Sequence, residues 1–210
     1  MFIKNRKDAY GGVSMIILGI TGGSGTGKTT VSRFLSDYGV DIIDCDLVAR
    51  KVVEKGTKAL GEISDYFGEE YINPDKTLNR KKLAKLVFNS PDMLLKLNEI
   101  THKYVEEYID LYIKNSNSEI VGIDAAALIE SGIYKKCNFV LSVLANKDIR
   151  ARRIVIRDNI PYFDALSRIN AQKNDEYYIE NSHYIVYNNS NIDEINTQIL
   201  KIIEDIRSKI

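Results

Sequence analysis

The stretch GITGGSGTGKTT, residues 19–30, constrains the fold of this chain more than any other part of the sequence. It follows a short apolar run, MIILGI, and precedes residues with the apolar spacing of a helix. Because glycine adopts backbone conformations that a Cβ obstructs, closely spaced glycines at this point predict a tight loop. The chain is therefore expected to pass from strand to loop to helix here.

The same stretch predicts a phosphate site. Gly22, four residues, and then Gly27-Lys28-Thr29 fit the pattern G-x-x-x-x-G-K-[ST], in which backbone N–H groups turn inward around phosphate oxygens. The helix that follows adds its N-terminal partial positive charge. Lys28 is expected to reach the outer phosphates of a nucleoside triphosphate, and the Thr29 hydroxyl to bind Mg²⁺. The nucleotide-binding residues that we predict are Gly22, Gly23, Ser24, Gly25, Thr26, Gly27, Lys28, Thr29 and Thr30.

Strand-length apolar runs alternate with helix-like stretches along the rest of the chain, which is typical of a parallel sheet covered by helices. The fold class that we predict is α/β, a P-loop NTPase with three α/β/α layers and a five-stranded parallel sheet. Two longer helical stretches interrupt the alternation, an insertion at about 56–116 and a lid at about 147–181. The predicted strands are Met15–Ile20, Val40–Ile43, Ile120–Ile123, Phe139–Leu144 and Tyr184–Tyr187.

Length and composition narrow the class of protein further. A chain of 210 residues suits one domain, predicted over 15–210, and residues 1–14 are expected to be a disordered extension without chemistry. Lys plus Arg and Asp plus Glu both number 29, so no basic footprint points to nucleic acid. Cys45 and Cys137 lack metal-ligand spacing and suit a reducing compartment. With no membrane-length or signal-like apolar run, the expected location is cytoplasmic.

The second predicted strand ends in two carboxylates, within DIIDCDLVAR. Asp44 and Asp46 share one face if the strand continues through them. Because ligands of an open α/β sheet bind beyond the carboxyl ends of its strands, Asp46 is predicted to lie near the γ-phosphate and to accept the proton of an attacking hydroxyl. An N-cap for the following helix is an equally good interpretation of Asp46, and the two roles are compatible.

The predicted lid is rich in arginine, with Arg150, Arg152, Arg153 and Arg157. Arg153 and Arg157 lie one helical turn apart, so together they are predicted to neutralise a transferring phosphoryl group. A solvated basic helix face is the alternative. A lid that closes after substrate binds would also exclude water.

A guanine-nucleotide switch fits less well. Asn146-Lys147-Asp148 is one residue short of an Asn-Lys-x-Asp base-reading motif, since Ile149 stands where its Asp should be. An N-cap at Asn146 is the better interpretation.

Taken together, these motifs resemble those of the dephospho-CoA kinase family, from Met15 onward. The resemblance rests on GITGGSGTGKTT, DCDLVAR, KTLNRKKLAKLVF, IDAAALIESGIYKKCNFVLSV, RARRIVIRD and RINAQ, in that order. The glycine loop alone is common to many families, whereas its combination with DCDLVAR and RINAQ is far more specific. The departures are modest: Cys45 stands for a common alanine, Ala126 for a proline, and Lys103 for a frequent proline.

The resemblance implies a reaction and a set of roles. The γ-phosphoryl group of ATP would pass to the ribose 3'-hydroxyl of dephospho-CoA, with Mg²⁺ present and no obligate protein partner. Asp46 would position or deprotonate that hydroxyl, while Arg50 and Arg80 would bind the acceptor. Gln172 would belong to the closing lid, and the helical insertion would bind the CoA moiety. The implied catalytic residues are Lys28, Asp46, Arg153 and Arg157.

Two other functions fit the loop as well. Another small P-loop kinase would phosphorylate a nucleoside or nucleotide and ignore dephospho-CoA. A regulatory module would bind ATP without transferring a phosphoryl group, and substitution of Asp46 would leave its function intact.

Overall fold

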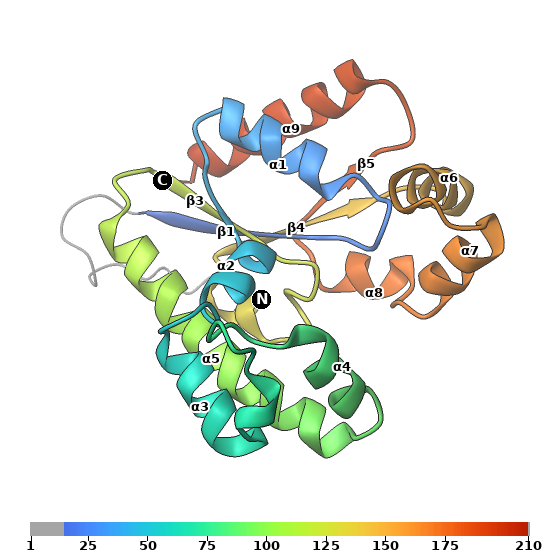
Figure 1. The fold of residues 1–210 in the computed structure, drawn as a ribbon. Coiled ribbons are helices and arrows are strands. Elements are labelled where there is room, and N and C mark those ends of the chain that lie inside the picture. Colours follow the sequence, from blue (N-terminus) through green and yellow to red (C-terminus); the bar gives the residue numbers. More distant parts are fainter. Residues whose placement is uncertain (1–14, 210) are drawn as a thin grey trace. The chain divides into compact units, whose positions relative to one another are not determined.

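The computed structural model describes residues 15–209 and has an α/β fold with a five-stranded sheet (Figure 1). The predicted extension, residues 1–14, lies outside the described residues. The chain divides into two units. We call them the sheet unit, which ends at Ile43 and resumes at Ser116, and the helical unit, Asp44–Asn115.

The sheet has the strand order β2-β3-β1-β4-β5. Its β1 strand lies in the centre and pairs in parallel with β3 and β4, so that Leu18 is opposite both Gly122 and Phe139. These findings confirm the predicted fold class, and each observed strand begins and ends within one residue of its predicted bounds. The strands are β1 Ile16–Thr21, β2 Asp41–Asp44, β3 Ile120–Asp124, β4 Phe139–Leu144 and β5 Tyr184–Tyr187.

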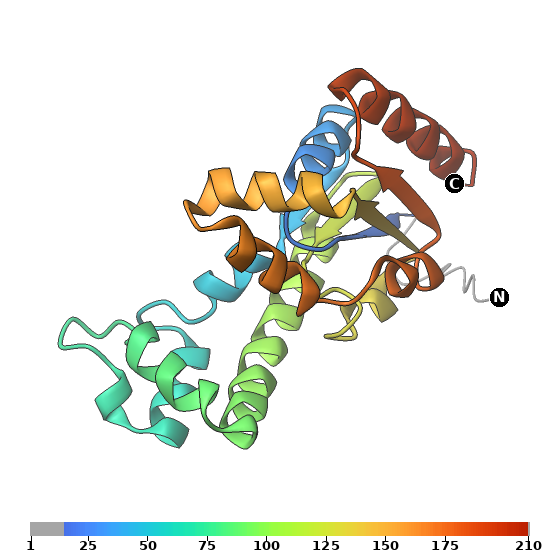
Figure 2. The ribbon, with the colours of Figure 1, turned by 90° about the vertical axis from the view of Figure 1, so that its right-hand side faces the viewer.

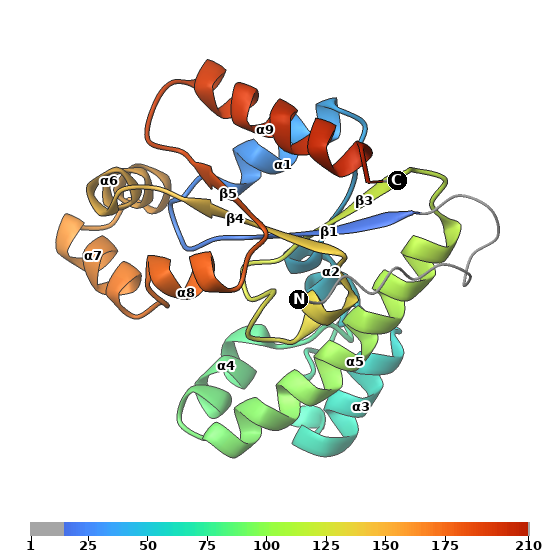
Figure 3. The same cartoon turned by 180° about the vertical axis from the view of Figure 1, so that it is seen from behind.

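Helices cover both faces of this sheet (Figures 1 and 3). On one face lie α1, Lys28–Asp37, and α9, Ile192–Arg207. On the other face lie α8, Asp175–Glu180, and the short 3₁₀ helix η2, Ile133–Lys136. The sheet unit therefore has the three predicted layers.

Beyond the carboxyl end of β4, α6 and α7 form a helical hairpin (Figure 2). Helix α6 spans Lys147–Asp158 and α7 spans Tyr162–Asn170. Their contact is apolar, since Ile154 and Ala165 are completely buried there. With α8, this hairpin makes up the predicted lid segment, residues 147–181.

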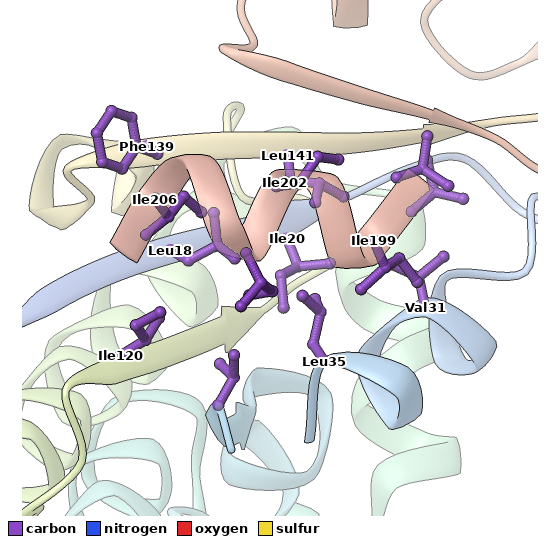
Figure 4. Close-up of a cluster of buried hydrophobic side chains, with 14 of the residues drawn as sticks. Leu18, Ile20, Val31, Leu35, Ile120, Phe139, Leu141, Ile199, Ile202 and Ile206 are labelled. Atoms are coloured by element: carbon purple, nitrogen blue, oxygen red, sulfur yellow. The ribbon is translucent and has the colours of Figure 1, made fainter. Parts of the chain in front are cut away.

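The main core lies between the central strands and the pair α1 and α9 (Figure 4). Leu18 and Ile20 of β1 are fully buried against this pair, and burying one such side chain stabilises a fold by about 1.5–3 kcal/mol. Close packing also explains Gly122 of β3, where a Cβ would lie 2.5 Å from Ile42 Cδ1. Further core residues are Val31, Leu35, Ile120, Phe139, Leu141, Ile199, Ile202 and Ile206.

The helical unit has its own small core, in which Ile63, Leu83 and Ile100 are buried. The side chain of Asn79 accepts a hydrogen bond from Lys82 N–H and so caps its helix. Within residues 15–209, no helix is both long and apolar enough to cross a membrane. The elements of this unit are α2 Cys45–Lys51, α3 Lys58–Phe67, η1 Glu69–Tyr71, α4 Arg80–Phe88 and α5 Pro91–Asn115.

His183, just before β5, is an exposed residue whose side chain contacts β4. Its Nδ1 accepts a hydrogen bond from Val140 N–H at 3.0 Å, and its ring packs edge-on against Phe139. Partial burial of the ring, and after it the positive charge of the nearby Lys209, lower the pKa of His183 from its ordinary value. The unfolded chain therefore takes up the proton first as the pH falls, so the contribution of His183 is present above about pH 6.5 and is lost below it.

We expect the free energy of unfolding, measured in urea, to fall between pH 7.5 and 5.5, and to fall less in His183→Asn. Asn keeps an acceptor for Val140 N–H but does not titrate. An equal pH dependence in both proteins would exclude His183 as its source.

Candidate active site

The glycine loop between β1 and α1 has the backbone that its sequence predicts. Gly25 and Gly27 have φ values of +79° and +88°, a left-handed region that favours glycine. Helix α1 starts directly after Gly27, which has no side chain to cap the first N–H groups. Such an uncapped helix start, at the carboxyl end of a central strand, suits a bound phosphate.

Thr26 of this loop and the two threonines at the start of α1 differ in exposure. Thr26 is fully buried, and its hydroxyl donates to Gly23 O at 2.9 Å. The Thr26 side chain therefore holds the loop together, which leaves only its backbone for a nucleotide. Thr29 is exposed in the first turn of α1, and Thr30 is half-buried.

Lys28 forms an ion pair that sequence reasoning missed. Its Nζ binds Asp124 Oδ1, and the other carboxylate oxygen accepts a hydrogen bond from Ser32 Oγ at 2.6 Å. Asp124 ends β3, beside β1, and is buried. The carboxyl-end rule that singled out Asp46 applies equally to Asp124, so the signal was present in the sequence.

Arg153 of α6 donates hydrogen bonds to carbonyl oxygens of the loop. One of its terminal nitrogens donates to Gly25 O and Thr26 O, both at 3.2 Å. The other donates to Asn188 O and Oδ1, and Asn188 Nδ2 in turn donates to Thr26 O at 2.8 Å. Arg153 therefore links the lid segment and the end of β5 to the nucleotide-binding loop.

The structure does not bring Arg157 to the partners of Arg153. The Arg157 side chain is exposed and forms a two-pronged pair with Asp158, at 2.7 and 2.9 Å. Asp158 also binds Arg168, and these partners lower its pKa to about 2, the Arg157 hydrogen bonds being the larger cause. Arg157 is therefore engaged within the lid segment in this structure, and its joint action with Arg153 on a phosphoryl group stays a prediction.

Gln172, which follows α7, contacts the loop directly. Its Oε1 accepts from Ser24 N–H at 2.9 Å, and its Nε2 lies 3.1 Å from Ser24 Oγ. Arg150 of α6, which is only 4% exposed, reaches the same position. Sequence reasoning noted Arg150 in the basic cluster but gave it no role in the site.

In the helical unit, the structure corrects the expected geometry of the two carboxylates. The strand does not continue through them: β2 ends at Asp44 and α2 begins at Cys45. Asp44, not Asp46, is the N-cap, because its Oδ1 accepts from Leu47 N–H at 2.9 Å. Asp46 is therefore an exposed residue in the first turn of α2, and the two side chains do not share a strand face.

Arg50 and Arg80 do come together within the helical unit. One terminal nitrogen of Arg80 donates to Arg50 O at 3.1 Å, and both side chains are exposed. Arg50 lies one helical turn after Asp46 on α2, so the two residues occupy one side of that helix.

The residues present suit ATP and a magnesium ion. The loop offers backbone donors, a lysine and an exposed threonine hydroxyl. Among residues 15–209, no three His, Cys, Asp or Glu side chains cluster as a metal cage. Mg²⁺ commonly needs no such cage in phosphoryl-transfer enzymes, since nucleotide phosphates and water supply most of its ligands.

The fold and the loop define a P-loop nucleotide-binding protein. A sequence profile of the dephospho-CoA kinases matches residues 16–194. A dephospho-CoA kinase from Listeria monocytogenes serovar 1/2a is 36% identical over 191 residues, which cover 89% of this chain and 95% of that protein. The chain therefore belongs to the dephospho-CoA kinase family, and its activity is the phosphorylation of dephospho-CoA to coenzyme A.

Solved structures agree with this fold. The crystal structure of TT1252 from Thermus thermophilus covers 91% of this chain and 97% of its own, with a TM-score of 0.81 at 27% identity. A dephospho-CoA kinase from Campylobacter jejuni covers 92% and 98%, with a TM-score of 0.67 at 22% identity.

Proposed function

We propose that this kinase transfers the γ-phosphoryl group of ATP to the ribose 3'-hydroxyl of dephospho-CoA. The observation that supports ATP as the phosphoryl donor is the loop of residues 22–29, with its left-handed glycines, its uncapped helix and Lys28, and the acceptor follows from the family to which the chain belongs. Phosphoryl transfer asks little covalent chemistry of a protein, so positioning and charge must supply most of the rate enhancement.

The loop residues would hold the nucleotide. Backbone N–H groups would surround the phosphates, and Lys28 would exchange Asp124 for the outer phosphate oxygens. Asp124 and Ser32 hold the lysine beside the loop until then. Thr29 would hold Mg²⁺, which, when bound, neutralises charge on the phosphate oxygens.

The acceptor would be handled by residues of the helical unit. Asp46 would accept the proton of the 3'-hydroxyl as its oxygen bonds to the γ-phosphorus and the bond from that phosphorus to the bridging oxygen breaks, releasing ADP. Arg50 and Arg80 would bind the acceptor's phosphates. The position of Asp46, two residues after β2, supports this role, because that end of a parallel strand is where ligands of such sheets bind.

The lid segment would supply positive charge and exclude water. Arg153 already contacts loop carbonyls, while Arg157 would have to leave Asp158 to reach a phosphate. Gln172, at the loop through Ser24, would follow the lid as it closes. A cytoplasmic location and the lack of an obligate protein partner stay predictions.

The test is a comparison of acceptors. We expect purified protein with ATP and Mg²⁺ to release ADP in the presence of dephospho-CoA, and the product to have the mass of coenzyme A. A panel of nucleosides and nucleoside monophosphates serves as the control. Turnover with one of these instead would favour the other small P-loop kinase, and nucleotide binding without any transfer would favour the regulatory module.

The site of transfer on the acceptor has its own control. An analogue of dephospho-CoA that lacks the ribose 3'-hydroxyl should bind without being phosphorylated. Phosphorylation of that analogue would contradict transfer to the 3'-hydroxyl while leaving the kinase activity intact.

A further inference from the structure

A buried arginine packs against the nucleotide-binding loop and has no role in the phosphoryl transfer proposed for this protein. Arg150, in the first half of α6, is 4% exposed. Its guanidinium stays charged in a protein, and a buried charge without partners is costly. Burial accordingly lowers the pKa of Arg150, and the Asp175 carboxylate opposes that shift. The fold therefore retains this charge at a cost, beside residues that are expected to bind phosphate.

All three guanidinium nitrogens of Arg150 have partners. Nε donates to Ser24 O at 3.0 Å, and one terminal nitrogen donates to Gln172 Oε1 at 3.0 Å. The other lies 3.6 Å from Asp175 Oδ1. Since these contacts use the fixed fork of the guanidinium, a lysine with a single ammonium group cannot reproduce them together.

Gln172 joins the same network. Its Oε1 accepts from both Arg150 and Ser24 N–H, and its Nε2 lies 3.1 Å from Ser24 Oγ. The two donors fix the orientation of the amide group. The N–H, the carbonyl and the hydroxyl of Ser24 are thus all held by two side chains of the lid segment.

The loop packs tightly against this network. A Cβ at Gly23 would lie 2.4 Å from a terminal nitrogen of Arg150 and 3.0 Å from Gln172 Oε1. At Gly25, a Cβ would lie 2.5 Å from the backbone oxygen of Arg150. The loop between these glycines therefore has little freedom to shift while the network is intact.

We propose that Arg150 is a positioning residue, which acts through Ser24 and Gln172 to hold the nucleotide-binding loop in its phosphate-binding conformation before nucleotide arrives. A loop ordered in advance loses less conformational freedom on binding, so the affinity for nucleotide is higher. This inference rests on the proposed use of ATP. It predicts a defect specific to the nucleotide, with the acceptor bound as before.

The test is Arg150→Lys, which keeps the charge and loses the fork. We expect the Kd of a fluorescent ADP analogue and the KM for ATP to rise about tenfold, and the KM for dephospho-CoA to stay within about twofold. Arg152→Lys is the matched control, because Arg152 is exposed on the same helix and should bind ADP as the wild type does. A Kd for ADP within about twofold of the wild-type value in folded Arg150→Lys would overturn the proposal.

Two further variants keep the inference testable should Arg150→Lys fold poorly. Gly23→Ala places a methyl group against the Arg150 guanidinium. Gln172→Ala removes the side chain that accepts hydrogen bonds from both Arg150 and Ser24 N–H. Both should weaken ADP binding, with thermal stability measured in parallel. A merely structural role would lower the folded fraction and leave the Kd of the folded protein unchanged, which would also overturn the proposal.

A double-variant cycle tests whether Arg150 acts through Gln172. Because the two side chains share one hydrogen-bond network, Arg150→Lys combined with Gln172→Ala should weaken ADP binding less than the product of the two single effects. Multiplicative effects would contradict action through Gln172. Wild-type protein that binds ADP but does not phosphorylate dephospho-CoA would instead contradict the proposed function, and leaves the test of Arg150 in place.

Discussion

Replacing Lys28 with methionine is expected to lower kcat by about a hundredfold or more, which corresponds to about 2.7 kcal/mol of transition-state stabilisation. Methionine keeps an unbranched apolar stem of similar length and removes the charge. Since phosphoryl transfer needs little covalent help from a protein, loss of the loop cation that we propose contacts the γ-phosphoryl group should lower mainly the rate of the chemical step. The measurement is steady-state turnover of dephospho-CoA at saturating ATP.

The ion pair between Lys28 and Asp124 requires a second variant, because Lys28→Met also leaves the buried Asp124 carboxylate without its cation. That carboxylate would keep the hydrogen bond from Ser32 but lose its cation, so the melting temperature should fall as well. Lys28→Met combined with Asp124→Asn should recover stability without recovering turnover. Lys201→Met, at an exposed position of α9, is the control and should behave as the wild type does.

Recovery of turnover together with stability in the double variant would contradict the catalytic role of Lys28. The first variant would then have been inactive because its core was strained and not because a phosphate contact was missing. Turnover of Lys28→Met within a few-fold of wild type would contradict the role more directly.

The sheet could be predicted from sequence because its signals are local. Residues of β1 and β4 are mostly apolar, with Thr21 and Ser142 the polar exceptions, as is typical of strands covered on both faces, and the glycine loop marks the turn into α1. The order of the strands is not local information. It follows from pairing between segments such as Ile16 and Ile120, more than a hundred residues apart.

The parts of the site that sequence reasoning missed are contacts between distant segments. Arg150 lies in a visible basic cluster, but nothing in the spacing of that cluster shows that Arg150 is buried while Arg152 is exposed. Similarly, Asp124 could be suspected from its strand end, but its pairing with Lys28 depends on β3 lying beside β1. In the same way, helical spacing does not reveal that Arg157 pairs with Asp158 in this structure, whereas Arg153 contacts the loop.

Asp44 and Asp46, at the end of β2 and the start of α2, show a different limit of prediction from sequence. The pattern of alternate residues predicted one shared strand face, but Asp44 ends the strand by capping α2. Asn, Asp and Ser are strong N-cap residues, so the competing local signal was present and outweighed the strand pattern. Asp44 and Asp46 therefore have separate positions and roles, and Asp44 is a matched control for a substitution of Asp46.

Asp46→Asn is expected to lower kcat by about a hundredfold or more and to leave the KM for ATP within about threefold. Asparagine has the same shape and can still accept a hydrogen bond from a hydroxyl, but it cannot take the proton. The first turn of α2 tolerates the neutral side chain, because the helix keeps its Asp44 cap. Turnover and ATP affinity should be measured on the same preparation, with circular dichroism to verify folding.

Asp44→Asn is the matched control, two residues away on the same segment. Because asparagine caps a helix as well as aspartate does, this variant should keep both stability and turnover near the wild-type values. If both variants lose turnover equally, the defect lies in the local backbone of α2 and not in a proton acceptor. If neither loses turnover, Asp46 is not the base, and the 3'-hydroxyl must give up its proton directly to a phosphoryl oxygen or to water. A selective loss in Asp46→Asn alone assigns the proton to its carboxylate, since the two variants differ only in which of the two acids is neutralised.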